Sequence, residues 1–180
     1  MNIIYLIGMP ASGKTFWGTR VAEAFHLPFI DLDNFIEQRE HQPIAQLFSK
    51  GEAWFRAKEH ASLIALISAI KEPTLIATGG GTPCFFNNLK QMQRSGITIY
   101  LDTHVDTLVS RLATDPVFRP LLKNTPDIAA ALEMMLRKRE VFYKQANYIL
   151  QSEDISLATF DEIISECTNK HSPQGLSLRW

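Results

Sequence analysis

The chain has 180 residues, of which 46% are hydrophobic and 21% charged, and 18 Lys and Arg residues against 19 Asp and Glu residues give a net charge of −1. This length and this apolar fraction suit one globular domain with a buried core. The near-neutral charge excludes the excess of Lys and Arg on which general binding to nucleic acids or acidic membranes depends, so neither partner is expected.

The apolar stretches and the cysteines exclude further classes of protein. The longest apolar stretches, such as 3–7, are far shorter than the roughly 20 residues of a membrane-spanning helix. Met1 runs directly into a strand-like segment without the pattern of a signal peptide, so a cytoplasmic location is expected. Cys84 and Cys167 form no CxxC pair, which favours ordinary thiols over a disulfide framework or a metal site.

Strand and helix patterns alternate along the chain. Residues 2–8 form a continuous β-branched and aliphatic run, as in a strand buried on both faces of a sheet. A helix at 14–25 and a short strand at 29–32 follow. The later predicted elements are three helices between 34 and 71, strands at 74–78, 97–101 and 148–150, and helices at 87–94, 105–113, 127–145 and 159–167.

This alternation predicts an α/β fold with an open, mostly parallel sheet and helices on both faces. Sheets of this kind bind ligands at the carboxyl ends of their strands. We predict that residues 114–126 form an irregular loop, of a length that often serves as a lid. We expect residues 1–168 to form a single domain and 169–180, which lack periodicity, to form a flexible tail.

The strongest motif is GMPASGKT at residues 8–15, which fits the phosphate-binding pattern GxxxxGK[ST] between a predicted strand and a predicted helix. Its glycines let backbone N–H groups converge on phosphate oxygens, and the helix N-terminus adds positive potential. In this context an ordinary glycine turn is the weaker interpretation. The candidate nucleotide-binding residues of the loop are Gly8, Ala11, Ser12, Gly13, Lys14 and Thr15, of which Lys14 would reach the outer phosphates and Thr15 would offer its hydroxyl to Mg²⁺.

Two carboxylates follow at the end of the second predicted strand. Asp31 and Asp33 would both emerge near the phosphate loop. One can hold a water of the magnesium shell while the other hydrogen-bonds an acceptor hydroxyl, as in phosphoryl-transfer sites. The structural alternative is that Asp33 caps a helix beginning at Asn34.

The glycine triplet 79–81 ends another predicted strand. Three consecutive glycines maximise the loss of backbone entropy on folding, which indicates close approach of the backbone to a ligand or an unusual turn. A tight connection alone is the alternative.

Arginines occur on three further elements. Arg56 is followed three residues later by Glu59, a spacing that is common in surface pairs of little energetic weight. Arg119 lies in the irregular loop, where it could close over a site. Arg139 lies on a helix, and its fork suits a carboxylate or a phosphate, although residues 137–139 would also fit a solvated basic patch. The histidines show no metal-ligand spacing and are assigned no role.

Six motifs therefore follow one another: the phosphate loop, Asp31-x-Asp33, GEAWFR with Glu59, the triplet 79–81, FRPLL at 118–122, and Arg139 with Tyr143 and Ala146. In this order they resemble the shikimate kinase family, a member of the nucleoside-monophosphate-kinase-like group of P-loop folds. The resemblance runs from residue 2 to about 150. It implies a three-layer P-loop kinase fold with a central five-stranded parallel sheet, substrate-binding helices at about 33–60 and a lid at about 114–126.

The resemblance also implies a reaction, which is Mg²⁺-dependent transfer of the γ-phosphate of ATP to the 3-hydroxyl of shikimate. The products would be shikimate 3-phosphate and ADP, on the route to chorismate and the aromatic amino acids. ATP and shikimate would then be the partners of the chain, Mg²⁺ its metal and a monomer its working form.

Site residues carry over from the family one by one. Lys14, Asp33 and Arg119 would be catalytic, and Thr15 and Asp31 would serve the metal. Arg111 would lie against the adenine, and Arg119 would approach both the phosphates and the acceptor. Arg56, oriented by Glu59, would bind the acceptor carboxylate together with Arg139. The implied substrate-binding set is Asp33, Arg56, Glu59, Gly79, Gly80, Gly81, Arg119 and Arg139.

Three alternatives stay open from the sequence. Another small-metabolite kinase of the same fold, such as one acting on gluconate, would differ in acceptor specificity. A nucleotide-dependent regulatory protein would have no need of a complete acceptor pocket. Nucleic-acid binding through residues 137–139 would show as steeply salt-dependent retention on DNA.

Overall fold

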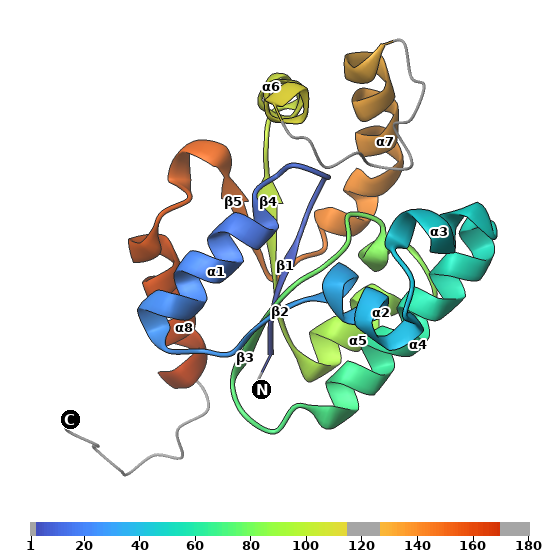
Figure 1. Cartoon of the computed structure of the whole chain (residues 1–180). Helices are drawn as coiled ribbons and strands as arrows, with labels where there is room; N and C mark the ends of the chain where they lie inside the picture. Colours follow the sequence, from blue (N-terminus) through green and yellow to red (C-terminus); the bar gives the residue numbers. More distant parts are fainter. Residues whose placement is uncertain (1–2, 115–126, 170–180) are drawn as a thin grey trace.

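A computed structural model of the chain describes residues 3–114 and 127–169, which form three layers with a parallel sheet in the middle (Figure 1). The sheet has the strand order β2-β3-β1-β4-β5. Its strands are β1 (Ile3–Ile7), β2 (Phe29–Asp31), β3 (Thr74–Ala77), β4 (Gly96–Asp102) and β5 (Tyr148–Gln151). The central strand β1 pairs in parallel with β3 and β4, so its carboxyl end opens between two neighbouring strands.

Helices cover both faces of the sheet. One face carries α1 (Lys14–Phe25) and α8 (Leu157–Asn169). The other carries α2 (Leu32–Glu40), α3 (Ile44–Ser49), α4 (Glu52–Ala69) and α5 (Asn88–Ser95). Figure 1 shows α6 (Val105–Thr114) and α7 (Ile128–Tyr143) rising beyond the carboxyl ends of the strands. Two short 3₁₀ turns, η1 (Thr82–Cys84) and η3 (Ser152–Asp154), follow β3 and β5.

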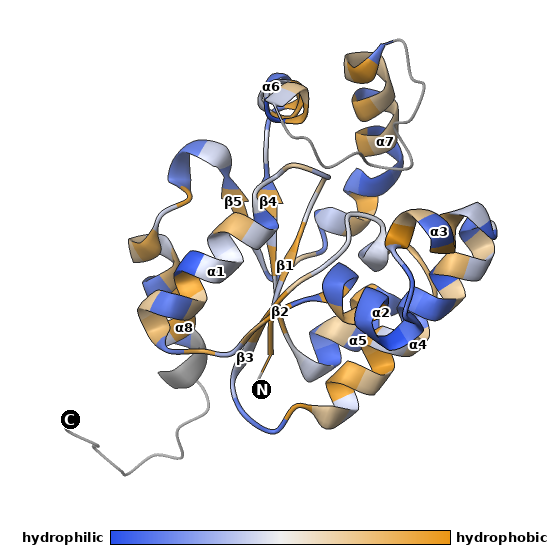
Figure 2. Ribbon diagram, viewed as in Figure 1, coloured by the Kyte–Doolittle hydropathy of each residue, from blue (hydrophilic) through white to orange (hydrophobic). Residues whose placement is uncertain are grey.

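The apolar run of β1 is buried on both faces, as the sequence predicts. Tyr5 and Ile7 point into the core beneath α2–α5 and α7, whereas Ile4 and Leu6 point into the core beneath α1 and α8. Successive side chains of a strand alternate between faces, so a run without polar residues needs helices on both sides. Figure 2 shows the hydrophobic colouring concentrated on the strands and on parts of the helices. The α/β prediction is thereby confirmed.

The predicted elements are present with small shifts at their ends. The first helix of the group between 34 and 71 begins at Leu32 because the Asp31 side chain accepts hydrogen bonds from the N–H groups of Asp33 and Asn34 at 3.0 and 3.4 Å. The alternative in which Asp33 caps this helix is therefore wrong, since Asp31 is the cap. The predicted helix 127–145 ends at Tyr143.

Some predictions fall on other parts of the chain. Most of the predicted lid, including Arg119, and nearly all of the predicted tail lie outside the described residues. Within residues 3–114 and 127–169, no helix has the length and apolar character needed to cross a membrane.

The close contact between β4 and β1 at Gly96 yields a prediction about stability. Gly96 begins β4 opposite Ile3, and a Cβ at this position would overlap the carbonyl oxygen of Ile3. We expect Gly96→Ala to lower the free energy of unfolding by about 1–3 kcal/mol, because β1 and β4 must separate to admit the methyl group. The measurement is the urea unfolding midpoint. A midpoint equal to that of the unsubstituted chain would contradict the close contact between β1 and β4.

Candidate active site

The phosphate loop forms the turn between β1 and α1, at the carboxyl end of the central strand. Gly8, Ala11 and Gly13 have φ angles of 143°, 63° and 94°, all in the left-handed region. A Cβ on Gly8 would lie 2.8 Å from the carbonyl oxygen of Leu101, so both conformation and space require glycine there. The loop has the curvature that a phosphate-binding turn needs.

Lys14 begins α1 and folds back over this loop. Its side chain is largely buried, and Nζ donates hydrogen bonds to the carbonyl oxygens of Met9 at 2.7 Å and Gly8 at 3.0 Å. These carbonyls hold the ammonium group at the mouth of the loop. An incoming phosphate oxygen would meet a positive charge that is already positioned.

Thr15 and Asp31 form the candidate metal position. The Thr15 hydroxyl donates to Asp31 Oδ2 at 2.8 Å, while Asp31 Oδ1 caps α2. A hydroxyl and a carboxylate are the hard oxygen donors that Mg²⁺ prefers, and this ion usually takes few protein ligands beside phosphates and water. No group of three or more His, Cys, Asp or Glu side chains suited to a metal occurs in the part of the chain that the structure describes. The pair therefore fits Mg²⁺ bound together with a nucleotide.

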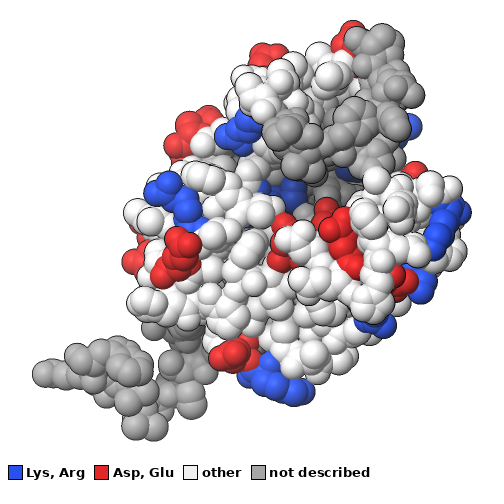
Figure 3. Space-filling view, in the orientation of Figure 1, with Lys and Arg blue, Asp and Glu red and all other residues white. Residues whose placement is uncertain are grey.

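A pocket connects the phosphate loop to the glycine triplet. It is lined by residues from the loop, from the carboxyl ends of β2 and β3, and from α6: Ala11, Gly13, Lys14, Thr15, Phe16, Asp31, Asp33, Thr78, Gly79, Gly80 and Arg111. Figure 3 shows basic side chains within a recess at the centre of this face, with acidic side chains along its lower rim. The pocket lies at the carboxyl edge of the sheet, as expected for a parallel α/β fold.

Each glycine of the triplet 79–81 makes room for a polar side chain. A Cβ on the first would lie 2.9 Å from Asp33 Oδ1 and 3.0 Å from Glu59 Oε1. A Cβ on the second would lie 3.2 Å from Arg139 Nη1, and one on the third would overlap the Arg56 guanidinium. The triplet thus serves close approach, and the interpretation as a tight connection alone does not fit.

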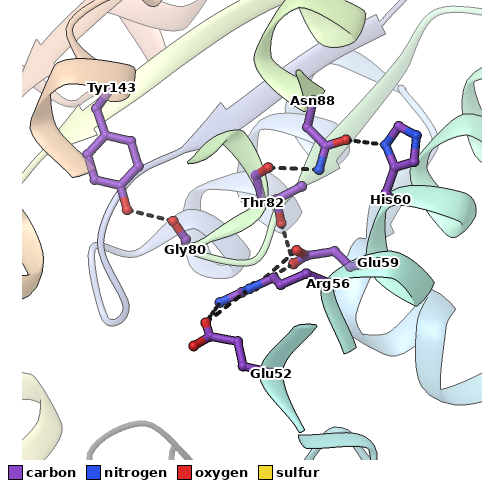
Figure 4. A network of polar contacts seen from close by, with 8 residues as sticks. All are labelled: Glu52, Arg56, Glu59, His60, Gly80, Thr82, Asn88 and Tyr143. Carbon is purple, nitrogen blue, oxygen red and sulfur yellow. Dashed lines mark hydrogen bonds and ion pairs between the residues drawn. The ribbon is translucent and has the colours of Figure 1, made fainter. Parts of the chain in front are cut away.

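Arg56 is buried and ion-paired on two sides (Figure 4). Its Nη1 donates to both oxygens of Glu59 at 2.9 and 3.1 Å, and Nε and Nη2 donate to one oxygen of Glu52 at 3.3 and 3.1 Å. The guanidinium also lies 4.6 Å from the ring centre of Phe85, within range of a cation–π interaction. Glu59 is fully buried, so the alternative of a weak surface pair is wrong.

Three further residues extend this network. Glu59 Oε1 accepts a hydrogen bond from the Thr82 hydroxyl at 2.8 Å. The Asn88 side-chain amide donates to the Thr82 carbonyl at 2.9 Å, and its oxygen lies 2.6 Å from His60 Nδ1. None of these three is among the sequence-predicted site residues. The sequence offers a weak signal for two of them: Thr82 comes directly after the triplet, and His60 comes directly after Glu59.

Helix α7 brings Arg139 and Tyr143 to the same site. The Tyr143 hydroxyl donates to the carbonyl oxygen of Gly80 at 2.6 Å, and burial raises the pKa of Tyr143, so the phenol keeps the proton that it donates. Arg139 is 8% exposed, and among the described residues no carboxylate lies within ion-pair distance of it. Arg137 is exposed and pairs with Glu133. The solvated-patch interpretation therefore fits Arg137 but not Arg139.

Cys84 lies close enough to the two buried arginines and to Glu59 for their charges to act on its thiol. Burial raises the pKa of its thiol to about 11, although Arg139 and Arg56 lower it and Glu59 raises it. At neutral pH the thiol is protonated and adds no negative charge to the site.

The remaining predicted residues have different outcomes. Arg111 on α6 donates from Nη1 to the carbonyl oxygen of Ala11 at 3.0 Å, which places it beside the phosphate loop, where it lines the pocket. Its contact with adenine stays a prediction. Arg119 is outside the described residues, so its closure over the site also stays a prediction.

Known proteins show the same sequence features and the same architecture. The model of the family described as shikimate kinase matches residues 10–170. A shikimate kinase from Bacteroides fragilis is 43% identical over 149 residues, which cover 81% of this chain and 82% of the relative.

Two solved structures extend the comparison to the fold. The shikimate kinase from Bacteroides thetaiotaomicron is 35% identical with a TM-score of 0.81, covering 93% of this chain and 98% of that one. The shikimate kinase from Acinetobacter baumannii in complex with shikimate is 30% identical with a TM-score of 0.83, covering 96% of each chain. On the family match, the identity and the common P-loop kinase fold, this chain belongs to the shikimate kinase family.

Proposed function

We propose that this chain, an ATP-dependent kinase by its family, transfers the γ-phosphate of ATP to the 3-hydroxyl of shikimate in the pocket between the phosphate loop and the glycine triplet. The observation that carries the proposal is the convergence of Asp33, Arg56 and Arg139 on residues 79–81, next to Lys14. Phosphoryl transfer depends on positioning and charge neutralisation, and this arrangement supplies both.

The acceptor end of the pocket suits a hydroxylated carboxylic acid. Arginine binds carboxylates bidentately, and Arg56 and Arg139 approach the triplet from two different helices. Asp33 lines the same pocket as the phosphate loop and lies next to Gly79, and its carboxylate would accept a hydrogen bond from the reacting hydroxyl. An acceptor without a carboxylate would leave the Arg139 charge, which is largely buried, without an ion-pair partner among the described residues.

The donor end is built from the phosphate loop. Backbone N–H groups of residues 8–13 and the Lys14 ammonium would bind the phosphates, and Arg111 would border the nucleotide. Thr15 would ligate Mg²⁺, and Asp31 would hold a water of its shell. When bound, the ion would neutralise charge on the phosphates. Arg119 would approach from residues 115–126. Residues 1–168 would form one domain that acts as a monomer.

A direct assay tests this function and its rival within the same fold. With ATP and Mg²⁺ present, we expect shikimate to accelerate ADP release, while gluconate leaves the rate at that without an acceptor. Mass spectrometry of the product should show one added phosphoryl group on shikimate. Acceleration by gluconate alone would overturn the acceptor assignment, and ATP binding without stimulation by either would favour a regulatory protein.

Asp33→Ala should lower kcat by about 100-fold or more while ATP affinity changes little, because the carboxylate would act on the reacting hydroxyl. Steady-state kinetics and ATP titration measure the two effects. The control is Asp161→Ala, an exposed carboxylate on α8. A near-normal kcat for Asp33→Ala would remove this residue from the mechanism.

Arg139→Ala should raise the KM for shikimate about tenfold or more, because a charge-assisted contact to the carboxylate is lost. The KM for ATP should change much less. Arg137→Ala is a matched control, since this exposed arginine lies two residues away on the same helix. Equal kinetics for the two variants would return Arg139 to the basic-patch interpretation.

A further inference from the structure

We propose that Thr82 and Asn88 are positioning residues for acceptor binding, which act by holding Glu59 and, through it, the Arg56 guanidinium. The inference rests on the proposed function, since it takes Arg56 as the group that binds the acceptor carboxylate. It assigns a role to two residues that belong neither to the site motifs nor to the pocket lining.

The two carboxylates that hold Arg56 are unequal. The Glu52 side chain is 47% exposed and contacts the guanidinium through one oxygen, whereas the Glu59 side chain is 1% exposed and uses both oxygens. An ion pair in contact with water contributes little to fixing a side chain. The orientation of Arg56 therefore depends mainly on Glu59.

Glu59 cannot by itself fix Arg56 against the acceptor site, because both residues belong to α4. Among the described residues, the hydrogen bond from Thr82 is the one that joins the Glu59 carboxylate to a different element. Thr82 begins η1, directly after the triplet 79–81. Its hydroxyl thus connects the helix that carries Arg56 to the backbone beside the acceptor.

Asn88 fixes the position of Thr82 in turn. The Thr82 carbonyl can only accept, so the Asn88 amide nitrogen must face it, and the Asn88 oxygen must face His60. His60 Nδ1 consequently carries the hydrogen of that bond. Thr82 and Asn88 are both fully buried, so no water competes for the bond between them.

The chain of bonds closes on α4, because His60 is the residue after Glu59 (Figure 4). Two consecutive residues of α4, Glu59 and His60, are therefore hydrogen-bonded to η1 and to the first residue of α5. Phe86 stacks on the His60 ring with 5.3 Å between ring centres and covers the His60 end of this hydrogen-bond network. Loss of the Thr82 hydroxyl would free the Glu59 carboxylate to rotate with Arg56, away from the acceptor.

The test is Thr82→Val, which keeps the shape of the side chain and removes its hydroxyl. We expect the KM for shikimate to rise about five- to tenfold, which is less than the loss of a direct hydrogen bond to a charged group would give, because the effect reaches the acceptor only through Glu59 and Arg56. The KM for ATP and kcat should stay within about twofold, because the donor end of the site is untouched. Thr82→Ser should restore the KM, since it restores the hydroxyl. If Thr82→Val does not fold, Thr82→Ala replaces it.

Thr98→Val is the matched control. Thr98 is also fully buried, and its hydroxyl donates to Asn147 at 2.9 Å between β4 and the start of β5, away from the acceptor pocket. We expect it to lower the melting temperature as Thr82→Val does, without changing the KM for shikimate. A structural role alone for Thr82 would make the two variants kinetically alike, and that result would overturn the proposal.

Arg56→Lys separates this inference from the proposed function. If Arg56 binds the acceptor, Arg56→Lys raises the KM for shikimate, and adding Thr82→Val to it raises the KM little further, because both act on one contact. An unchanged KM for Arg56→Lys would refute the assignment of Arg56 and the inference with it. A raised KM for Arg56→Lys with a normal KM for Thr82→Val would refute the inference alone.

Discussion

The close approach permitted by three consecutive glycines is the constraint on which the site depends. At the end of β3, the missing side chains of residues 79–81 leave the space that Asp33, Arg56 and Arg139 occupy. These side chains come from three different helices, α2, α4 and α7. A Cβ in the triplet would crowd a charged side chain, so volume limits the sequence there, whereas none of the three glycines has a φ angle in the left-handed region.

Buried charge sets the second constraint. An arginine that is 3% exposed requires compensation, and Arg56 receives it from Glu59, from Glu52 and from an aromatic ring. Arg139, in contrast, has no ion-pair partner within the described ranges. The neutral thiol of Cys84 adds no anion. The site is therefore most complete electrostatically when it holds an anionic acceptor.

The sheet brings these constraints to one edge. Because β1 is central and both of its neighbours run parallel to it, the phosphate loop and the triplet leave the sheet side by side. Tyr143 adds a bond from α7 to the Gly80 carbonyl, across 63 residues of sequence. Helix α7 is thus tied directly to the backbone of the triplet.

The sequence by itself determined the features that depend on local chemistry. The apolar runs of β1 and β4, the turn chemistry of residues 8–15 and the helix beginning at Lys14 all follow from neighbouring residues, and so the fold class and the order of the motifs were predictable. Tertiary structure alone decided which charges are buried. The residues near Arg137 and Arg139 in the sequence do not indicate which of the two is buried. An i,i+3 pair such as Arg56 and Glu59 has the same spacing as a surface pair.

The hydrogen bonds that hold Glu59 and His60 were equally unpredictable from the sequence. Its bonds join residues 23 and 28 positions apart, Thr82 to Glu59 and His60 to Asn88. Hydrogen bonds of this range form only after the helices have packed on the sheet, and no periodicity marks their members. Local patterns therefore fixed the elements and the phosphate loop, whereas the packing of α4, η1 and α5 decided how the acceptor end of the site is held.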